Sequence, residues 1–442
     1  MAIAQLPGFL LAFALAWALY FLGVALLPAS SMFGPVSEAI LLQLDFALLA
    51  GIAALATWLL SDGIASRPSH DAGGTVADDD RLRLASRVSL ALSGVGLLAL
   101  FVDKVFVQHI DYFGGLAAAR IEWASLGAER DGISSMWSAL GYLLSTCFFV
   151  AVALLVMRPE TFSSTERVIA WLSSLGLVLG NSVLTGGRSF LLLLAAAVVA
   201  FAFLRSDLGK SLPRIRFKGI LAFSAAIAAA GAYVLYVFAA RAELTEIDVH
   251  RYAVEMLEFL GGQPTPAFEQ LSGDTWFGRL AGLLALALAY LVHSAFTFAA
   301  IVEAPPQHGD LLFGYLRELA AKLGLTDRPD LDWLLAGRFP SLPGALYLDG
   351  GVALLAVGAL ALGVLMALSA RLCQRYPWSL TALSVWVAVQ TTALLSPLLM
   401  AAEVLSYPFV IVEFLLIAAV ARVSRLRASV PTTHPVRPAE RG

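Results

Sequence analysis

The chain has 442 residues, of which 59% are hydrophobic and only 14% are charged, and its net charge is −3. Soluble domains carry about 25% charged residues, so this composition excludes a water-soluble protein and indicates lipid as the main solvent. The two cysteines, Cys147 and Cys373, make neither a disulfide framework nor a metal cluster.

The first apolar run begins almost at Met1, without a basic leader or a clear cleavage site, and therefore predicts a retained helix. A membrane-crossing helix needs roughly 20 apolar residues. On that criterion about ten crossing helices are expected. In chain order they are 6–27, 38–60, 88–107, 137–157, 168–185, 189–204, 219–240, 345–368, 379–400 and 404–421.

The basic residues orient these helices, because cytoplasmic loops carry an excess of Lys and Arg. With the N-terminus in the cytoplasm, the inner loops hold Arg67, Arg81, Arg83, Arg87, Arg158, Arg167, Arg205, Lys210, Arg214, Arg216, Lys218, Arg371 and Arg375. Arg422, Arg425 and Arg427 then place the C-terminus in the cytoplasm. Both ends of 241–344 lie outside, so the further apolar stretch 280–303 is expected not to cross. We expect an interfacial or re-entrant helix pair broken near His293; an eleventh span is the alternative.

The expected fold is an all-α polytopic membrane protein in four parts. These are a seven-helix bundle (1–240), a large outer segment (241–344), C-terminal transmembrane helices (345–427) and a disordered cytoplasmic tail (428–442). Within the outer segment, 251–260 and 315–323 have the apolar spacing of amphipathic helices. An outer loop of this length is typical of a functional segment.

The most informative motif is Thr185-Gly186-Gly187-Arg188-Ser189, in the outer turn between two predicted spans. The glycines permit a sharp turn, and the free N–H groups of the following helix attract anions. Arg188 adds a permanent charge with a bidentate donor geometry. The motif therefore predicts a phosphate site. The alternative is a plain hairpin whose arginine reaches lipid headgroups.

Other polar residues are expected at the same face. Arg241, Arg251 and Arg338 are suited to lipid phosphates or diphosphates, although each is also consistent with a solvated loop charge. The candidate acid–base groups are His293, Glu303, Asp349, Glu403 and Glu413. Three of them have a structural alternative: an N-cap for Asp349, a packed histidine for His293, and a hydrogen bond between helices for Glu413. No metal-ligand spacing is present and no cofactor is expected.

The order of these motifs resembles the O-antigen polymerases, also called oligosaccharide repeat-unit polymerases. The resemblance rests on the Thr185–Ser189 turn, the Tyr290-Leu-Val-His293 stretch, and Phe339-Pro-Ser-Leu-Pro-Gly344 leading into Leu346-Tyr-Leu-Asp349-Gly350-Gly351. It covers most of the chain in architecture, through short motifs. It implies a bacterial inner-membrane enzyme with a periplasmic segment that joins undecaprenyl-diphosphate-linked repeat units. Membrane lipid, a chain-length regulator and a flippase are its implied partners, and nucleic acid is not.

The resemblance also assigns residues. The family's Gly-Arg turn matches Gly187 and Arg188, and its loop arginine followed by glycine matches Arg251 and Gly262. A second such pair is not reproduced, since eleven residues after Arg338 the chain has Asp349. The histidine of the related O-antigen ligases has a loose counterpart in His293.

The implied mechanism is displacement of a lipid diphosphate by a sugar hydroxyl. Arg188, with Arg241 and Arg251, would stabilise the leaving diphosphate, helped by Gly186, Gly187, Ser189 and Arg338. His293 or Asp349 would take the proton. Three alternatives stay open: an O-antigen ligase, a lipid-linked sugar flippase or other transporter, and a membrane scaffold without chemistry. Transporters usually show inverted repeats and several polar midplane helices, whereas Glu413 is the one acidic residue placed mid-span here.

Overall fold

The computed structural model is about 81% helical, as expected for an all-α multi-pass membrane protein. The structure describes residues 6–34, 36–61, 76–112, 134–185, 189–210, 235–243, 245–271, 273–304, 339–377, 379–401 and 407–428, together with a few isolated residues between them. All structural statements below refer to these residues.

Within these ranges, seven helices are long and apolar enough to cross a membrane, or eight if one bent pair counts as a span. They comprise α1 (Gly8–Leu26), α2 (Val36–Leu60), α4 (Val76–Phe101) with the π-helix η1 (Val102–Val107), α6 (Met136–Leu144) with α7 (Phe148–Met157), α8 (Ser164–Leu184), α9 (Ser189–Asp207) and α17 (Leu342–Arg375). Two shorter helices, α18 (Leu380–Leu395) and α19 (Phe409–Ala428), follow. Each corresponds to a predicted span. Most of the predicted span 219–240 lies outside the described residues, so the count of ten stays a prediction.

Helix starts follow ordinary capping chemistry. Ser163 and Glu166 form a capping box at the start of α8, each side chain accepting from the other residue's backbone N–H. Ser341 caps α17, because its hydroxyl accepts a 3.2 Å hydrogen bond from the Gly344 N–H. α17 begins at Leu342, seven residues before Asp349, and is interrupted by a kink at Gly350-Gly351, so a capping role for Asp349 at the helix after the kink stays a prediction.

One end of the bundle is held together by polar contacts between helix termini. The Gly8 N–H donates to Asp207 Oδ1 over 2.6 Å, which joins the start of α1 to the end of α9. Arg371 Nη2 donates to the Trp58 carbonyl over 2.6 Å, which joins the end of α17 to the end of α2. Arg158 pairs with Asp79 at 3.2 Å. These contacts gather several of the basic residues predicted for the inner loops, so this end is called the basic end.

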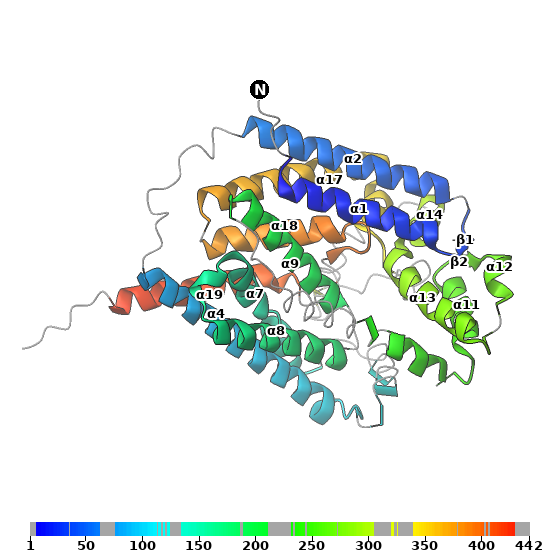
Figure 1. The fold of residues 1–442 in the computed structure, drawn as a ribbon, viewed down its shortest axis with the longest axis horizontal. Helices are drawn as coiled ribbons and strands as arrows, with labels where there is room; N and C mark the ends of the chain where they lie inside the picture. The colour runs from blue at the N-terminus through cyan, green and yellow to red at the C-terminus, as the bar shows by residue number, and fades with distance from the viewer. Residues whose placement is uncertain are drawn as a thin grey trace, which may run out of the picture.

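The opposite end carries the segments between α9 and α17 that the structure describes (Figure 1). They are α11 (Val249–Phe259), β2 (Gly262–Pro264), α12 (Pro266–Glu269), α13 (Trp276–Val292) and α14 (Ser294–Glu303). β2 pairs antiparallel with β1 (Ala29–Ser31), which directly follows α1. α11 confirms the amphipathic helix expected at 251–260. The helix expected at 315–323 lies almost wholly outside the described residues.

α13 and α14 meet at a bend of 51°, and His293 is the residue between them. The predicted break in this stretch is confirmed. Both flanks of the pair return to the short connection after α1. The Thr265 N–H donates to the Pro28 carbonyl over 2.9 Å, and a Cβ on Gly34 would lie 3.6 Å from Glu303 Oε1.

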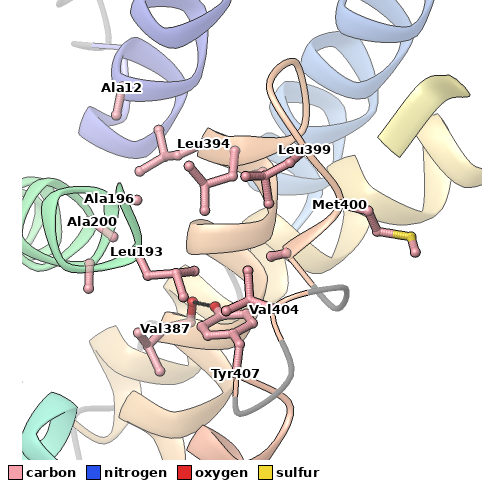
Figure 2. Close-up of a cluster of buried hydrophobic side chains, with 14 of the residues drawn as sticks. Ala12, Leu193, Ala196, Ala200, Val387, Leu394, Leu399, Met400, Val404 and Tyr407 are labelled. Carbon is pink, nitrogen blue, oxygen red and sulfur yellow. Dashed lines mark hydrogen bonds between the residues drawn. The ribbon is translucent and has the colours of Figure 1, made fainter. Parts of the chain in front are cut away.

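The described residues between α18 and α19 lie outside regular α-helix and are mostly buried. Leu399, Met400, Val404 and Tyr407 belong to the hydrophobic core, and the Tyr407 hydroxyl donates to the Val387 carbonyl over 3.0 Å (Figure 2). Irregular backbone at membrane depth is tolerated where protein surrounds it. This segment therefore enters the bundle alongside α18 before α19 begins.

Candidate functional site

The predicted phosphate-binding turn lies between two packed helices. α8 ends at Leu184 and α9 begins at Ser189, and the two helices contact each other. The Thr185 hydroxyl donates to the Asn181 carbonyl over 2.7 Å, closing the end of α8. Gly186, Gly187 and Arg188 lie outside the described residues, as does the Ser189 side chain. Four residues, 185–188, connect the two helices, and Thr185 alone of these is described, so the tight turn stays a prediction.

This turn lies at the end of the bundle opposite the basic end. α1 and α9 both contain 19 residues, and the start of α1 is bonded to the end of α9. Because α9 ends at the basic end, its start lies towards the opposite end of the bundle, as does the end of α1, where β1 pairs with β2. The α8–α9 turn and the α11–α14 segments thus share one end.

A buried polar cluster adjoins the turn and is centred on Asp103 in η1. Its carboxylate accepts hydrogen bonds from Ser135 (2.6 Å), Ser134 (2.8 Å) and Gln108 (2.5 Å), and Lys104 Nζ lies 3.6 Å from Oδ2. Asp103 and Lys104 are both buried. π-helical turns inside α-helices are frequent at functional sites. We did not predict this cluster, although two adjacent charges at the end of the apolar run 88–107 were the available signal.

Tyr112 connects this cluster to the turn. Its hydroxyl donates to the Leu184 carbonyl over 2.8 Å. Burial, and then the negative charge of Asp103, raise the pKa of Tyr112 to about 12. The hydroxyl therefore keeps its proton and its hydrogen bond across the physiological range. Tyr112 fixes the last turn of α8 directly before Thr185.

His293 is buried at the bend between α13 and α14, and both ring nitrogens have a backbone partner. Nδ1 lies 3.2 Å from the Tyr290 carbonyl oxygen, which can only accept. Nε2 lies 3.2 Å from the Phe339 N–H, which can only donate. The imidazole is therefore neutral and carries its proton on Nδ1. It ties the start of the α17 region to the bend, as a packed structural histidine would.

The residue after His293 belongs to a hydrogen-bond chain across four elements. Gln43 Nε2 lies 3.0 Å from the Tyr20 hydroxyl, and that hydroxyl lies 3.0 Å from Ser294 Oγ. Ser294 Oγ donates to the Pro397 carbonyl over 2.7 Å. Because the carbonyl can only accept, the bonds run from Gln43 through Tyr20 and Ser294 to Pro397. Nothing in the sequence pattern pointed to this chain, since its members are uncharged and scattered.

The outer arginines are not all brought together. Arg251 is 63% exposed and pairs with Glu255 on its own helix at 3.0 Å. Arg241 lies in the helical stretch 235–243, three residues after Phe238, whose ring lies 5.0 Å from that of Tyr290. Arg338 lies outside the described residues. Arg241 thus lies about one helical turn from a residue that contacts Tyr290 near the end of α13.

Gly262 has a packing role. A Cβ at this position would lie 2.8 Å from the ring of Phe296 in α14. The glycine allows β2 to lie close against α14. Packing therefore gives a structural reason for the glycine at position 262.

The predicted acidic groups fall into different environments. Asp349 is only 6% exposed and precedes a kink in α17 at Gly350-Gly351, where Gly351 has φ +62°. Glu413 is buried in the bundle, and its Oε2 accepts a 2.7 Å hydrogen bond from Thr146, as the interhelical alternative expected. Glu303 is exposed, and Glu403 lies outside the described residues.

No group of three or more His, Cys, Asp or Glu side chains with metal-binding geometry occurs within the part of the chain that the structure describes. Comparison with protein-family models, with curated proteins and with solved structures finds no match for this chain.

Proposed function

We propose that this chain is a membrane glycosyltransferase that joins undecaprenyl-diphosphate-linked oligosaccharide repeat units into O-antigen or exopolysaccharide, at the periplasmic face of a bacterial inner membrane. One observation supports it most: the α8–α9 turn and the helix break at His293 share one end of the bundle. An enzyme that acts on a lipid headgroup needs its polar groups at the membrane surface. A transporter needs them along a path through the midplane.

The proposed topology has about ten crossing helices, each of roughly 20 residues, with both termini in the cytoplasm. The basic end faces the cytoplasm, because Lys and Arg concentrate in cytoplasmic loops. In this proposal the α13–α14 pair does not cross, which is supported by the contacts of Thr265, before α12, and of Glu303, at the end of α14, with the connection that follows α1. The segment 241–344 is then periplasmic throughout.

The proposed chemistry is a displacement at the anomeric carbon of the donor glycan. A hydroxyl oxygen of the acceptor glycan forms the new bond, and the lipid diphosphate departs with the electron pair of the old one. Arg188 and the first N–H groups of α9 stabilise the negative charge that grows on the diphosphate. Arg241 is placed to assist, while Arg251 is held by Glu255.

The acceptor hydroxyl must also lose its proton. His293 becomes a base when Nε2 exchanges the Phe339 N–H for that hydroxyl, since Nδ1 already carries the proton. Asp349, buried beside the α17 kink, is the other candidate.

Deletion of the gene tests the function. A polymerase mutant makes lipid A that carries a single repeat unit. A ligase mutant makes uncapped lipid A, and a flippase mutant accumulates lipid-linked units on the cytoplasmic leaflet. Either of the last two phenotypes contradicts the proposal.

A further inference from the structure

α13 is apolar apart from the exposed Arg279 in its first turn. Its buried residues include Gly278, Gly282, Ala285, Leu286, Ala289 and Val292. Its exposed apolar residues are Trp276, Phe277, Leu280, Leu284 and Leu291. At 3.6 residues per turn, these five occupy a stripe about 100° wide, opposite the buried face. The set is called the α13 stripe below.

The neighbouring helix has a different outer surface. α11 packs against α13 so closely that a Cβ on Gly282 would lie 3.0 Å from the His250 Cα. The exposed residues of α11 include Arg251, Glu255 and Glu258. α11 thus presents charges to its surroundings, as a helix in water does, whereas α13 presents hydrocarbon. The charged surface of α11 and the apolar surface of α13 thus lie on two adjacent helices (Figure 1).

The α13 stripe continues onto a candidate membrane span. A Cβ on Gly23 of α1 would lie 2.8 Å from Val292 and 3.3 Å from Leu288, so the two helices touch there. On α1, the leucines Leu19, Leu22 and Leu26 are exposed on the turns next to Gly23. On α13, Leu284 and Leu291 lie one turn either side of Leu288. The exposed faces of both helices therefore form one apolar surface.

We propose that α13 lies along the membrane in the leaflet at the β1–β2 end of the bundle, with the α13 stripe docked against the acyl chains of bilayer lipids. Trp276, which is 76% exposed, sits at headgroup depth, where tryptophan is enriched. α11 rests above it in the aqueous layer. This surface concerns lipid contact alone and does not depend on the proposed enzymatic activity.

Spin-label depth measurements test the proposal in the full-length protein in nanodiscs of phosphatidylethanolamine and phosphatidylglycerol. Single cysteines replace Leu280, Leu284 and Leu291, with Glu255→Cys on α11 as the matched water-facing control. The native Cys147 and Cys373 are buried and need no replacement. Power saturation with oxygen and with a water-soluble nickel chelate gives the depth of each label.

We expect the three α13 labels to favour oxygen over nickel and to lie within about 8 Å of one another in depth, and the Glu255→Cys label to favour nickel. A helix standing upright would separate positions 280 and 291 by about 16 Å. Such a separation, nickel access at all three sites, or spin–spin broadening from a second copy overturns the proposal. Quenching of Trp276 fluorescence by brominated lipid tests lipid contact without cysteine substitutions. The signal of Trp276 is the difference between the native protein and Trp276→Phe. We expect quenching, and its absence contradicts lipid contact.

Discussion

Removal of the Tyr20 hydroxyl tests how the helix break is held in place. In Tyr20→Phe, Gln43 loses the partner of its Nε2, and its Oε1 already has no partner among the described residues. A buried polar group left without a partner costs about 1–3 kcal/mol, while hydrogen bonds inside membrane proteins average about 0.6 kcal/mol and reach about 1.7. Because both polar atoms of the Gln43 side-chain amide then lack a hydrogen-bond partner among the described residues, we expect a loss of about 1–2 kcal/mol in the free energy of unfolding.

Equilibrium unfolding in mixed detergent micelles measures this loss. The matched control is Tyr236→Phe, since Tyr236 is 62% exposed, and we expect it to change stability by less than about 0.5 kcal/mol. The double variant Tyr20→Phe with Gln43→Met removes both partners, so it should recover part of the loss. A Tyr20→Phe variant as stable as the control, or a double variant whose loss equals the sum of the single losses, refutes the reasoning.

Three further predictions concern other parts of the structure. Asp103→Ala removes the buried carboxylate that accepts from Ser134, Ser135 and Gln108 and pairs with Lys104, so we expect about 3–5 kcal/mol of destabilisation in the same unfolding assay; a change below about 1 kcal/mol contradicts the buried cluster. Gly351→Ala places a side chain at φ +62° and should cost about 1–3 kcal/mol, whereas an unchanged midpoint would argue against the kink. The raised pKa of Tyr112, about 12 in the folded state, means that the unfolded state loses its tyrosine proton first, so stability falls as pH rises from 10 towards 12. Tyr112→Phe should show a smaller fall, and an identical pH profile argues against the bond to Leu184.

The sequence predicted the long apolar helices because a 20-residue hydrophobic run has few alternatives in lipid. It also predicted the break at His293, where a polar pair interrupts an apolar stretch. It did not predict that α19 begins several residues late, after a buried irregular segment. The described residues of that segment are as apolar as those of a membrane-spanning helix. Only their packing against α18 distinguishes the segment from such a helix.

Parts of the candidate site could be predicted from the sequence where charged residues or glycines marked them. The α8–α9 turn follows from Gly186-Gly187-Arg188, and the adjacent Asp103 cluster had a signal in its two charges. The chain from Gln43 to Pro397 had none, because its residues lie far apart in the sequence and only the tertiary fold joins them. The sequence did not show that a helical segment capped by Ser341 precedes Asp349, nor that the helix is kinked at Gly350-Gly351.

The central claim is that Arg188 stabilises a lipid diphosphate at the end of the bundle shared with His293. The most direct test reconstitutes the protein in liposomes with undecaprenyl-diphosphate-linked repeat units and separates the products by length. We expect a ladder of polymers from the native protein and from Arg279→Ala, an exposed arginine on α13 that serves as the control. We expect no ladder from Arg188→Ala inserted at the same level. Normal chain lengths from Arg188→Ala would contradict the account.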